Sequence, residues 1–593
     1  MKKNRKIGFA FWEQIEEKRN KSRILYGENW EEQQISDPLG NNRVYAVYFL
    51  FLIFVFVLIG KIFDVMILNG AKNKELAEQN RIRLNVIEAP RGVIYDRNKN
   101  PLVRNTVAYL KRQKDGTTQI IDRDTALAKI AGNDFESAGI YTKTIREYPY
   151  KDVLGHVLGY LTEIEKEEMN SSSGKTDYQP GDKIGRLGIE EQYESVLRGV
   201  NGKELIETDA LGRTIKKIGE KQPFSGRDVR LTLDLRLQKL VKDAFLDKEK
   251  GAVVASDPST GEILAVYSSP SFDPNLFTMP QTVESSKALK NILESKESPL
   301  FNRAIGGVYP SGSTFKIVTA AAGLETGKIS AKTEIEDVGE IKIGPYRFPN
   351  WYFLQYGGKD GMVNVVRALK RSNDIFFYKA GEMVGLDSLV LMARKFGLSE
   401  KTGIDFPHES KGLMPDEEWK KKTIGDNWYL GDTYHLAIGQ GYLLVTPLQI
   451  NLMTNVIANG GKLCRPHLRL NDQSDSNASD VLCWDIGLKT ETISLIKEGM
   501  KEACLEGGTA WPFFDFKIQS LTSQETEKIS VGCKTGTAEF GDPNNNTHGW
   551  FTVFAPFEKP KITMTILVEG AGEGSNVAAP VAKKVLSEWL RSN

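Results

Sequence analysis

Residues 309–322 read YPSGSTFKIVTAAA, a turn containing proline and glycine followed by a run typical of a buried helix. Ser313 is predicted to fall in the first turn of this helix, where free backbone N–H groups and the positive end of the helix dipole gather. These groups stabilise a developing oxyanion. Lys316 lies three residues on, on the same helix face, with about 5–6 Å between the two Cβ atoms. The stretch therefore predicts a serine nucleophile with a lysine base; the alternative is a capping serine beside an exposed lysine.

A lysine accepts a proton from serine only when its amine is neutral. Burial lowers a lysine pKa, and so does a second cation nearby. We therefore expect Lys316 to be buried, with another cationic side chain close to it.

A second motif, Ser372-Asn373-Asp374, follows the segment 363–371 and precedes an apolar helix start. The Ser372 hydroxyl is a candidate for relaying a proton between a lysine and a leaving group. Asp374 is a candidate for positioning that relay or binding a substrate amide. The alternative for such a triplet is an ordinary helix N-cap.

The third motif, Lys534-Thr535-Gly536-Thr537, is expected at the end of a strand. Gly536 allows a ligand to approach the backbone closely, and the Thr537 N–H can donate to an oxyanion. Lys534 and Thr535 can hold a carboxylate. The alternative is a plain strand end with a surface lysine.

Other copies of the motifs have a poorer context. Ser172 and Lys175 lie in a polar serine- and glycine-rich loop, Ser494 and Lys497 on a predicted helix surface, and Lys401 in a loop before a proline turn. We interpret them as structural. The order of the three selected motifs is typical of penicillin-binding proteins and class A β-lactamases.

The rest of the chain predicts an α+β fold. Strand patterns and a helix come first, helices occupy the middle, and three strands and a helix come last, which favours an antiparallel sheet flanked by helices within a domain spanning 226–593. The expected strands are 228–233, 251–256, 262–267, 530–535, 549–554 and 561–568, with Thr547 in a connection, and the expected helices include 235–245 and 578–590.

One segment is predicted to cross a membrane. Residues 44–60 read VYAVYFLFLIFVFVLIG without a charge or proline, and the apolar character continues to Leu68, so we place a transmembrane helix at 44–66. The basic tail at 1–43 favours a cytoplasmic N-terminus, which puts the catalytic domain outside the cell membrane. Residues 67–225 are expected to form an extended pedestal domain.

Composition excludes several classes of function. The 78 Lys and Arg against 77 Asp and Glu leave a formal net charge of +1, without the basic footprint of nucleic-acid binding. Cysteines occur at 464, 483, 504 and 533 without a C-x-x-C pair, so neither a metal site nor a cofactor is expected. We expect free, mostly buried thiols in preference to disulfides.

From about residue 86 to the end, the chain resembles class B penicillin-binding proteins, most closely their elongation-type branch, penicillin-binding protein 2. The similar stretches are APRGVIYDRNKNPLVRN (89–105), REYPY (146–150), GRLGIEEQYE (185–194), LRGVNGKE (197–204), PLFNRAIGGVYPSGSTFK (299–316) and AIGQGYLLVTPLQ (437–449).

This resemblance implies a peptidoglycan D,D-transpeptidase that β-lactams inhibit by acylating Ser313. Lys316 is implied as base and Ser372 as proton relay, while Lys534 and Thr535 hold the substrate carboxylate. A D,D-carboxypeptidase side activity is compatible with the same chemistry. The N–H groups of Ser313 and Thr537 are implied as the oxyanion hole.

Two features depart from the family pattern. The second motif ends in Asp374 rather than Asn, which favours the elongation branch and a role in cell shape, and Cys533 precedes Lys534 where a small residue is common. No glycosyltransferase domain precedes the transpeptidase. The implied partners are therefore peptidoglycan stem peptides, β-lactams, the membrane, elongation-complex proteins and a separate glycosyltransferase of the shape, elongation, division and sporulation (SEDS) family. The alternatives are a β-lactam sensor and a non-catalytic scaffold that activates such a partner.

Overall fold

The structure is a computed structural model that describes residues 41–113, 118–132, 139–171, 178–209, 214–245, 250–279, 282–470, 482–519 and 526–591. Residues 1–40 of the predicted tail and the Ser172/Lys175 pair lie outside the described residues. The chain divides into two compact units, which are taken separately below. The first unit comprises Met1–Val86 and Lys203–Lys221, and the second comprises Ile87–Gly202 and Gln222–Asn593.

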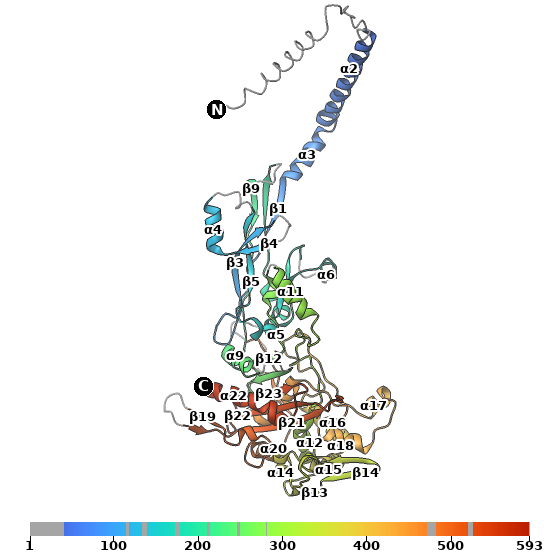
Figure 1. Cartoon of the computed structure of the whole chain (residues 1–593), viewed down its shortest axis with the longest axis vertical. Coiled ribbons are helices and arrows are strands. Elements are labelled where there is room, and N and C mark those ends of the chain that lie inside the picture. Colours follow the sequence, from blue (N-terminus) through green and yellow to red (C-terminus); the bar gives the residue numbers. More distant parts are fainter. Residues whose placement is uncertain are drawn as a thin grey trace, which may run out of the picture. The chain divides into compact units, whose positions relative to one another are not determined.

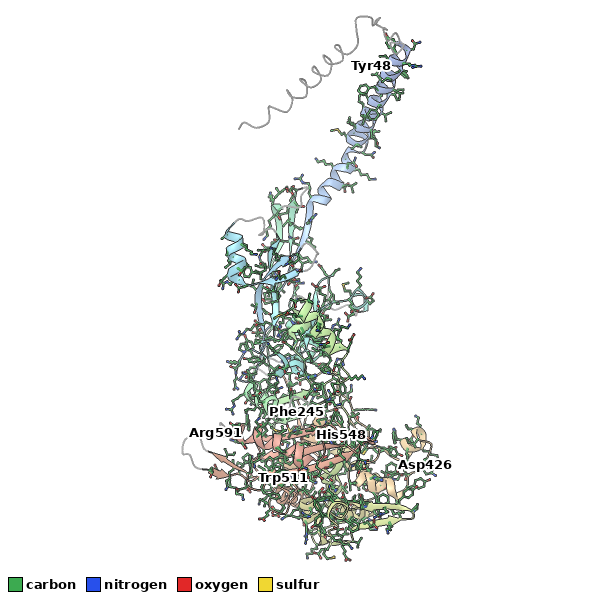
Figure 2. The ribbon with its side chains drawn as sticks, viewed as in Figure 1. Tyr48, Phe245, Asp426, Trp511, His548 and Arg591 are labelled. Carbon is green, nitrogen blue, oxygen red and sulfur yellow. A yellow bond between two sulfur atoms is a disulfide. The ribbon has the colours of Figure 1, made fainter. Side chains whose placement is uncertain are left out.

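The first unit carries the predicted membrane helix. Helix α2 (Asn41–Phe63) continues through a π-helical turn (Asp64–Leu68), and α3 (Gly70–Arg81) follows. Residues Asn42–Leu68 form a helical stretch long and apolar enough to cross a bilayer. Its side chains are exposed, as Figure 2 shows at Tyr48, so the apolar surface is free to contact lipid. The unit ends in a three-stranded sheet, order β1-β8-β9, of β1 (Ile82–Ile87), β8 (Gly202–Thr208) and β9 (Thr214–Lys221).

The first part of the second unit, residues 87–202, is built from small sheets and short helices. Its buried centre is a charge cluster in which the Glu190 carboxylate accepts hydrogen bonds from Arg91 Nε at 2.7 Å and Arg146 Nε at 2.8 Å. Glu190 is fully buried, and two cations compensate the cost of burying its charge. One sheet has the order β4-β3-β5, from β3 (Arg104–Arg112), β4 (Thr118–Ile121) and β5 (Ile140–Glu147), and another pairs β6 (Tyr160–Glu163) with β7 (Lys183–Arg186). Strand β2 (Ile94–Tyr95) pairs with β10 (Val229–Arg230). The helices are α4 (Arg123–Ala131), α5 (Gly155–Leu158), α6 (Lys166–Ser171), α7 (Gly188–Gln192) and α8 (Glu194–Leu197).

A five-stranded antiparallel sheet organises the rest of the second unit (Figure 1). Its order is β12-β11-β23-β22-β21, so chain-distant strands become neighbours and β21 lies at the edge. The bounds are β11 (Gly251–Ser256), β12 (Ile263–Ser269), β21 (Gly532–Glu539), β22 (Thr547–Ala555) and β23 (Ile562–Val568).

Alternation along the strands divides the core in two. Val253 and Ala255 of β11 join the core formed with α9 (Leu235–Ala244) and α22 (Ala579–Leu590), whereas Ala252 and Val254 face the larger core on the other side. The larger core contains α12 (Lys316–Glu325), α14 (Val365–Arg371), α15 (Asp374–Val384), α19 (Pro447–Ala458) and α20 (Thr490–Ala503). Further helices are α10 (Asn275–Thr278), α11 (Val283–Leu293), α13 (Trp351–Tyr356), α16 (Leu386–Lys395), α17 (Glu417–Thr423), α18 (Leu430–Ala437) and α21 (Gly574–Val577). Further antiparallel strand pairs are β13 (Ile335–Asp337) with β16 (Gly361–Val363), β14 (Glu340–Ile343) with β15 (Tyr346–Pro349), β17 (Lys462–Cys464) with β18 (Cys483–Asp485), and β19 (Lys517–Gln519) with β20 (Thr526–Lys528).

The α+β class and the antiparallel sheet flanked by helices are confirmed. Two local predictions were wrong: Thr547 begins β22 instead of lying in a connection, and the strand expected at 228–233 is only Val229–Arg230. Both follow from pairing, because a strand extends only as far as its partner provides hydrogen bonds. The predicted domain boundaries stay predictions.

The expectation of free thiols was also wrong, because the cysteines form the disulfides Cys464–Cys483 and Cys504–Cys533. The first pair lies at directly opposed positions of β17 and β18. The second joins the end of α20 to β21. Both pairings depend on tertiary neighbours, which the spacing of the cysteines does not reveal.

Candidate functional site

A tight turn carries Ser313. Residues Gly312–Phe315 form a 3-10 turn, and the α-helix begins only at Lys316, slightly later than predicted. Gly312 has φ +53°, its N–H donates to the Gly439 carbonyl at 2.8 Å, and a Cβ there would lie 2.5 Å from the Thr537 carbonyl oxygen. Glycine thus lets the turn press directly against β21. Ser313 itself is partly exposed, between buried neighbours, so its hydroxyl is accessible.

Lys316 extends from the first turn of α12 into a fully buried polar site. Its Nζ donates to Asp374 Oδ1 at 2.6 Å, to the Ser372 carbonyl at 2.8 Å and to Ser372 Oγ at 3.4 Å. The first two predicted motifs are therefore in direct contact.

Ser372 occupies the junction between α14 and α15 in a left-handed conformation, φ +52°. Its Oγ also accepts a hydrogen bond from Lys534 Nζ at 2.9 Å, so one hydroxyl lies between two lysine amines. Non-glycine residues in this conformation are uncommon and gather at functional sites. Asn373 is the N-cap of α15, and its side-chain oxygen accepts a hydrogen bond from the Phe376 N–H. The triplet therefore combines a helix cap with the Ser372 and Asp374 side chains, which contact the lysines.

Lys534 lies in the middle of β21 rather than at a strand end, which corrects the prediction. It is fully buried, and alternation puts Cys533 in the core of α9 and α22 and Lys534 on the opposite face of the sheet. Its Nζ also donates to the Thr535 carbonyl at 2.9 Å. A Cβ on Gly536 would lie 3.1 Å from the Ser311 carbonyl oxygen, so this glycine allows the Ser313 turn to approach the strand.

A second group of residues, most of them outside the three motifs, supports the site through backbone and side-chain contacts. The Trp351 N–H donates to Asp374 Oδ2 at 2.9 Å, and Asn350 accepts from the Asp374 N–H at 3.1 Å. Asn373 Nδ2 donates to Asp337 at 2.9 Å and to Asp360 at 3.1 Å. No local sequence signal identifies these residues, since their contacts span up to 36 positions.

Burial controls the electrostatics of the two lysines. Burial lowers the pKa of Lys316, while the Asp374 carboxylate opposes that shift. The pKa of Lys534 lies well below its usual range, first because of burial and then because Lys316 is close. The expected burial and neighbouring amine are both present. The pair favours a neutral amine, which can accept a proton.

The other motif copies stay apart from this site. Ser494 is exposed on α20, and Lys497 lies over the rings of Phe554 and Phe557. Lys401 is exposed in a loop. Within the described part of the chain, no group of three or more His, Cys, Asp or Glu side chains is arranged to hold a metal ion.

Comparisons with known proteins match two domains of the chain. Residues 251–587 match the penicillin binding protein transpeptidase domain, and residues 111–231 match the penicillin-binding protein dimerisation domain. The chain is 32% identical to the peptidoglycan D,D-transpeptidase MrdA of Acinetobacter baumannii, covering 92% of this chain and 87% of that protein.

Solved structures are similar over most of the chain. The complex of penicillin-binding protein PBP2 and MreC from Helicobacter pylori has a TM-score of 0.72 at 28% identity, covering 86% of this chain and 99% of that one. A chain of a peptidoglycan synthase complex that coordinates polymerization and crosslinking has the same TM-score and identity, covering 92% and 98%.

The close approach at Gly312 predicts a stability difference between two glycine substitutions. Gly312→Ala and Gly327→Ala both place a side chain at positive φ, +53° and +69°, but only Gly312 has a neighbour within 4 Å in the way. Gly327→Ala should cost about 1 kcal/mol from backbone strain, and Gly312→Ala about 1–3 kcal/mol more from the clash. Thermal unfolding of the two variants measures this, and equal midpoints would contradict the packing of the turn on β21.

Proposed function

Because this chain belongs to the family of penicillin-binding protein transpeptidases, we propose that Ser313 is the nucleophile of its acyl transfer. The protein is a peptidoglycan D,D-transpeptidase. The proposal assigns this activity to particular side chains. The observation that carries it is the Ser372 hydroxyl, which lies between the amines of Lys316 and Lys534.

Acylation begins when Ser313 Oγ attacks the carbonyl carbon between the two terminal D-alanines of a stem peptide. The serine proton passes to the neutral amine of Lys316, and the N–H groups of Ser313 and Thr537 hold the oxyanion. The peptide bond then breaks. The departing D-alanine amine receives a proton through the Ser372 hydroxyl, which contacts both lysines.

The second step forms the cross-link. An amine of a neighbouring stem peptide attacks the ester carbon of the acyl-enzyme and gives up a proton to the same lysine–serine relay. The ester bond breaks, and Ser313 recovers its proton. When water takes the place of the amine, the outcome is D,D-carboxypeptidase activity.

Lys534, Thr535 and Gly536 are assigned to the substrate carboxylate. The substrate carboxylate favours the charged form of Lys534, which burial otherwise disfavours. Gly536 leaves the backbone open to the ligand. A β-lactam carries a carboxylate in a comparable place, so it acylates Ser313 in the same manner. Asp374 contacts Lys316 directly and is assigned to orienting that amine.

A scaffold or a β-lactam sensor is the second candidate. A scaffold has no need for two fully buried lysines on one hydroxyl, because burying amines costs stability. A sensor needs only the acylation step. The similarity to peptidoglycan D,D-transpeptidases favours the enzyme over the sensor.

The nucleophile is tested by Ser313→Ala. Without the hydroxyl there is no atom to form the acyl bond, so covalent labelling of the purified full-length protein by a fluorescent penicillin should disappear. Ser494→Ala, which changes the serine of another motif copy on α20, should be labelled like the wild type. Labelling that persists in Ser313→Ala would remove the assignment. In cells depleted of the wild-type protein, Ser313→Ala should fail to restore growth. That failure would show that the cell needs the enzyme activity and not only a scaffold.

The role of Asp374 predicts a shift in pH dependence. Lys316 acts as base only when neutral, so the acylation rate rises with pH through its pKa. Asp374 raises that pKa by charge and hydrogen bonding. Asp374→Asn should therefore move the rising limb of the plot of acylation rate against pH to lower pH. Asp426→Asn, which changes an exposed carboxylate beside the buried Lys420, is the control. A rising limb that stays in place would show that Asp374 does not control the charge of Lys316.

The membrane topology and partners extend the proposal. We assign the tail to the cytoplasm and residues 67–593 to the outer side of the cell membrane, where peptidoglycan is cross-linked. The similar Helicobacter pylori protein binds MreC, and another similar chain belongs to a peptidoglycan synthase complex that coordinates polymerization and crosslinking. By this similarity, elongation-complex proteins and a SEDS-family glycosyltransferase are the proposed partners.

Reporter fusions test the topology. Alkaline phosphatase fused at the C-terminus should be active and green fluorescent protein dark, because only the phosphatase folds outside the cytoplasm.

Co-purification of the full-length protein with a SEDS glycosyltransferase from detergent extracts should depend on residues 41–68. The reverse reporter pattern, or unchanged co-purification after exchange of this helix for an unrelated one, would refute the respective assignment.

A further inference from the structure

Thr509 lies outside the three motifs, yet its hydroxyl contacts one of them. Its Oγ1 is 2.8 Å from Oγ1 of Thr535. Thr535 is buried, 7% exposed, whereas Thr509 is partly exposed. We infer that Thr509 is a positioning residue that orients the Thr535 hydroxyl toward the C-terminal carboxylate of the substrate. The inference rests on the function proposed above, since it deepens the carboxylate site.

The Thr509–Thr535 pair has two hydroxyl protons, one on each side chain. A threonine hydroxyl has one proton to donate and two lone pairs that accept. When Thr509 donates to Thr535, the Thr535 proton is left for an anion. When Thr535 donates instead, the partly exposed Thr509 has the free proton. A carboxylate only accepts, so it selects an orientation that aims a proton at it and gains a charge-assisted hydrogen bond.

The backbone holds Thr509 firmly in place. A Cβ on Gly508 would lie 2.3 Å from the Ala503 carbonyl oxygen, so a glycine is required where the chain turns back after α20. The disulfide Cys504–Cys533 joins the same segment to the residue before Lys534. On the other side, the indole of Trp511, labelled in Figure 2, donates to Asn576 at 3.2 Å. A fixed hydroxyl loses little entropy on binding, which suits a positioning role.

The segment 504–510 also supports the relay serine. Arg371, which directly precedes Ser372, donates through Nη1 to the Gly507 carbonyl at 3.0 Å. Lys370 forms an ion pair with Glu502 at 2.7 Å. Residues 502–510 thus contact Thr535 of the third motif and the two residues that precede the second motif.

Acylation of the full-length protein in detergent tests the inference. The rate constants for benzylpenicillin and for its methyl ester are measured by competition with a fluorescent penicillin. Thr509→Val should slow the free acid roughly three- to tenfold, because it removes the neutral Thr509–Thr535 hydrogen bond that orients the hydroxyl facing the anion. The ester has no anion, so its rate should change little. Thr509→Ser keeps the hydroxyl and should restore the acid rate, while the exposed Thr490→Val at the far end of α20 should match the wild type.

The outcomes separate the inference from the proposed function. Equal losses with acid and ester, or a Thr509→Ser variant as slow as Thr509→Val, would show a purely structural role and overturn the inference. So would an unchanged acid rate in Thr509→Val. The double variant Thr509→Val/Thr535→Val should be no slower than Thr535→Val, because both act through one hydrogen bond. A wild-type protein without an adduct on Ser313 would instead overturn the proposed function itself.

Discussion

Two buried amines that share one hydroxyl are the constraint on which the rest of the site depends. Lys316 and Lys534 are fully buried, and both contact Ser372 Oγ. Burying one ammonium is costly, and a second beside it adds repulsion. The fold compensates with the Asp374 carboxylate and with backbone carbonyls, and the remaining cost lowers both pKa values. The same energy that destabilises the charged forms prepares an amine to accept a proton.

The backbone reaches this arrangement through a few unusual conformations. Gly312 and Ser372 both have positive φ, and each lies where two elements meet next to the lysines. Gly312 lets the Ser313 turn touch β21, and Ser372 turns the chain between two helices so that its hydroxyl faces inward. Such strain persists only where the surrounding packing holds it. The five-stranded sheet and its two helical cores provide that packing.

A polar layer beneath the second motif explains why the motif is stable while carrying charge. Asp337 accepts hydrogen bonds from the side-chain amides of Asn350 and Asn373, and Arg371 pairs with Asp360. Every member has a partner, which is the condition under which a buried polar network gives rigidity. Asp374 is thereby held with one oxygen on Lys316 and the other on the Trp351 N–H.

Local pattern was sufficient for the parts of the protein that depend on neighbours in the chain. The three-residue spacing of Ser313 and Lys316, the apolar run after residue 44 and the short apolar segments of β11, β22 and β23 are local signals of helix, membrane span and strand. Only the tertiary structure decided how the four cysteines pair and that Trp351 and Thr509 belong to the site. These contacts join residues far apart along the chain, and their formation depends on the packing of the sheet and helices, which no short stretch of sequence encodes.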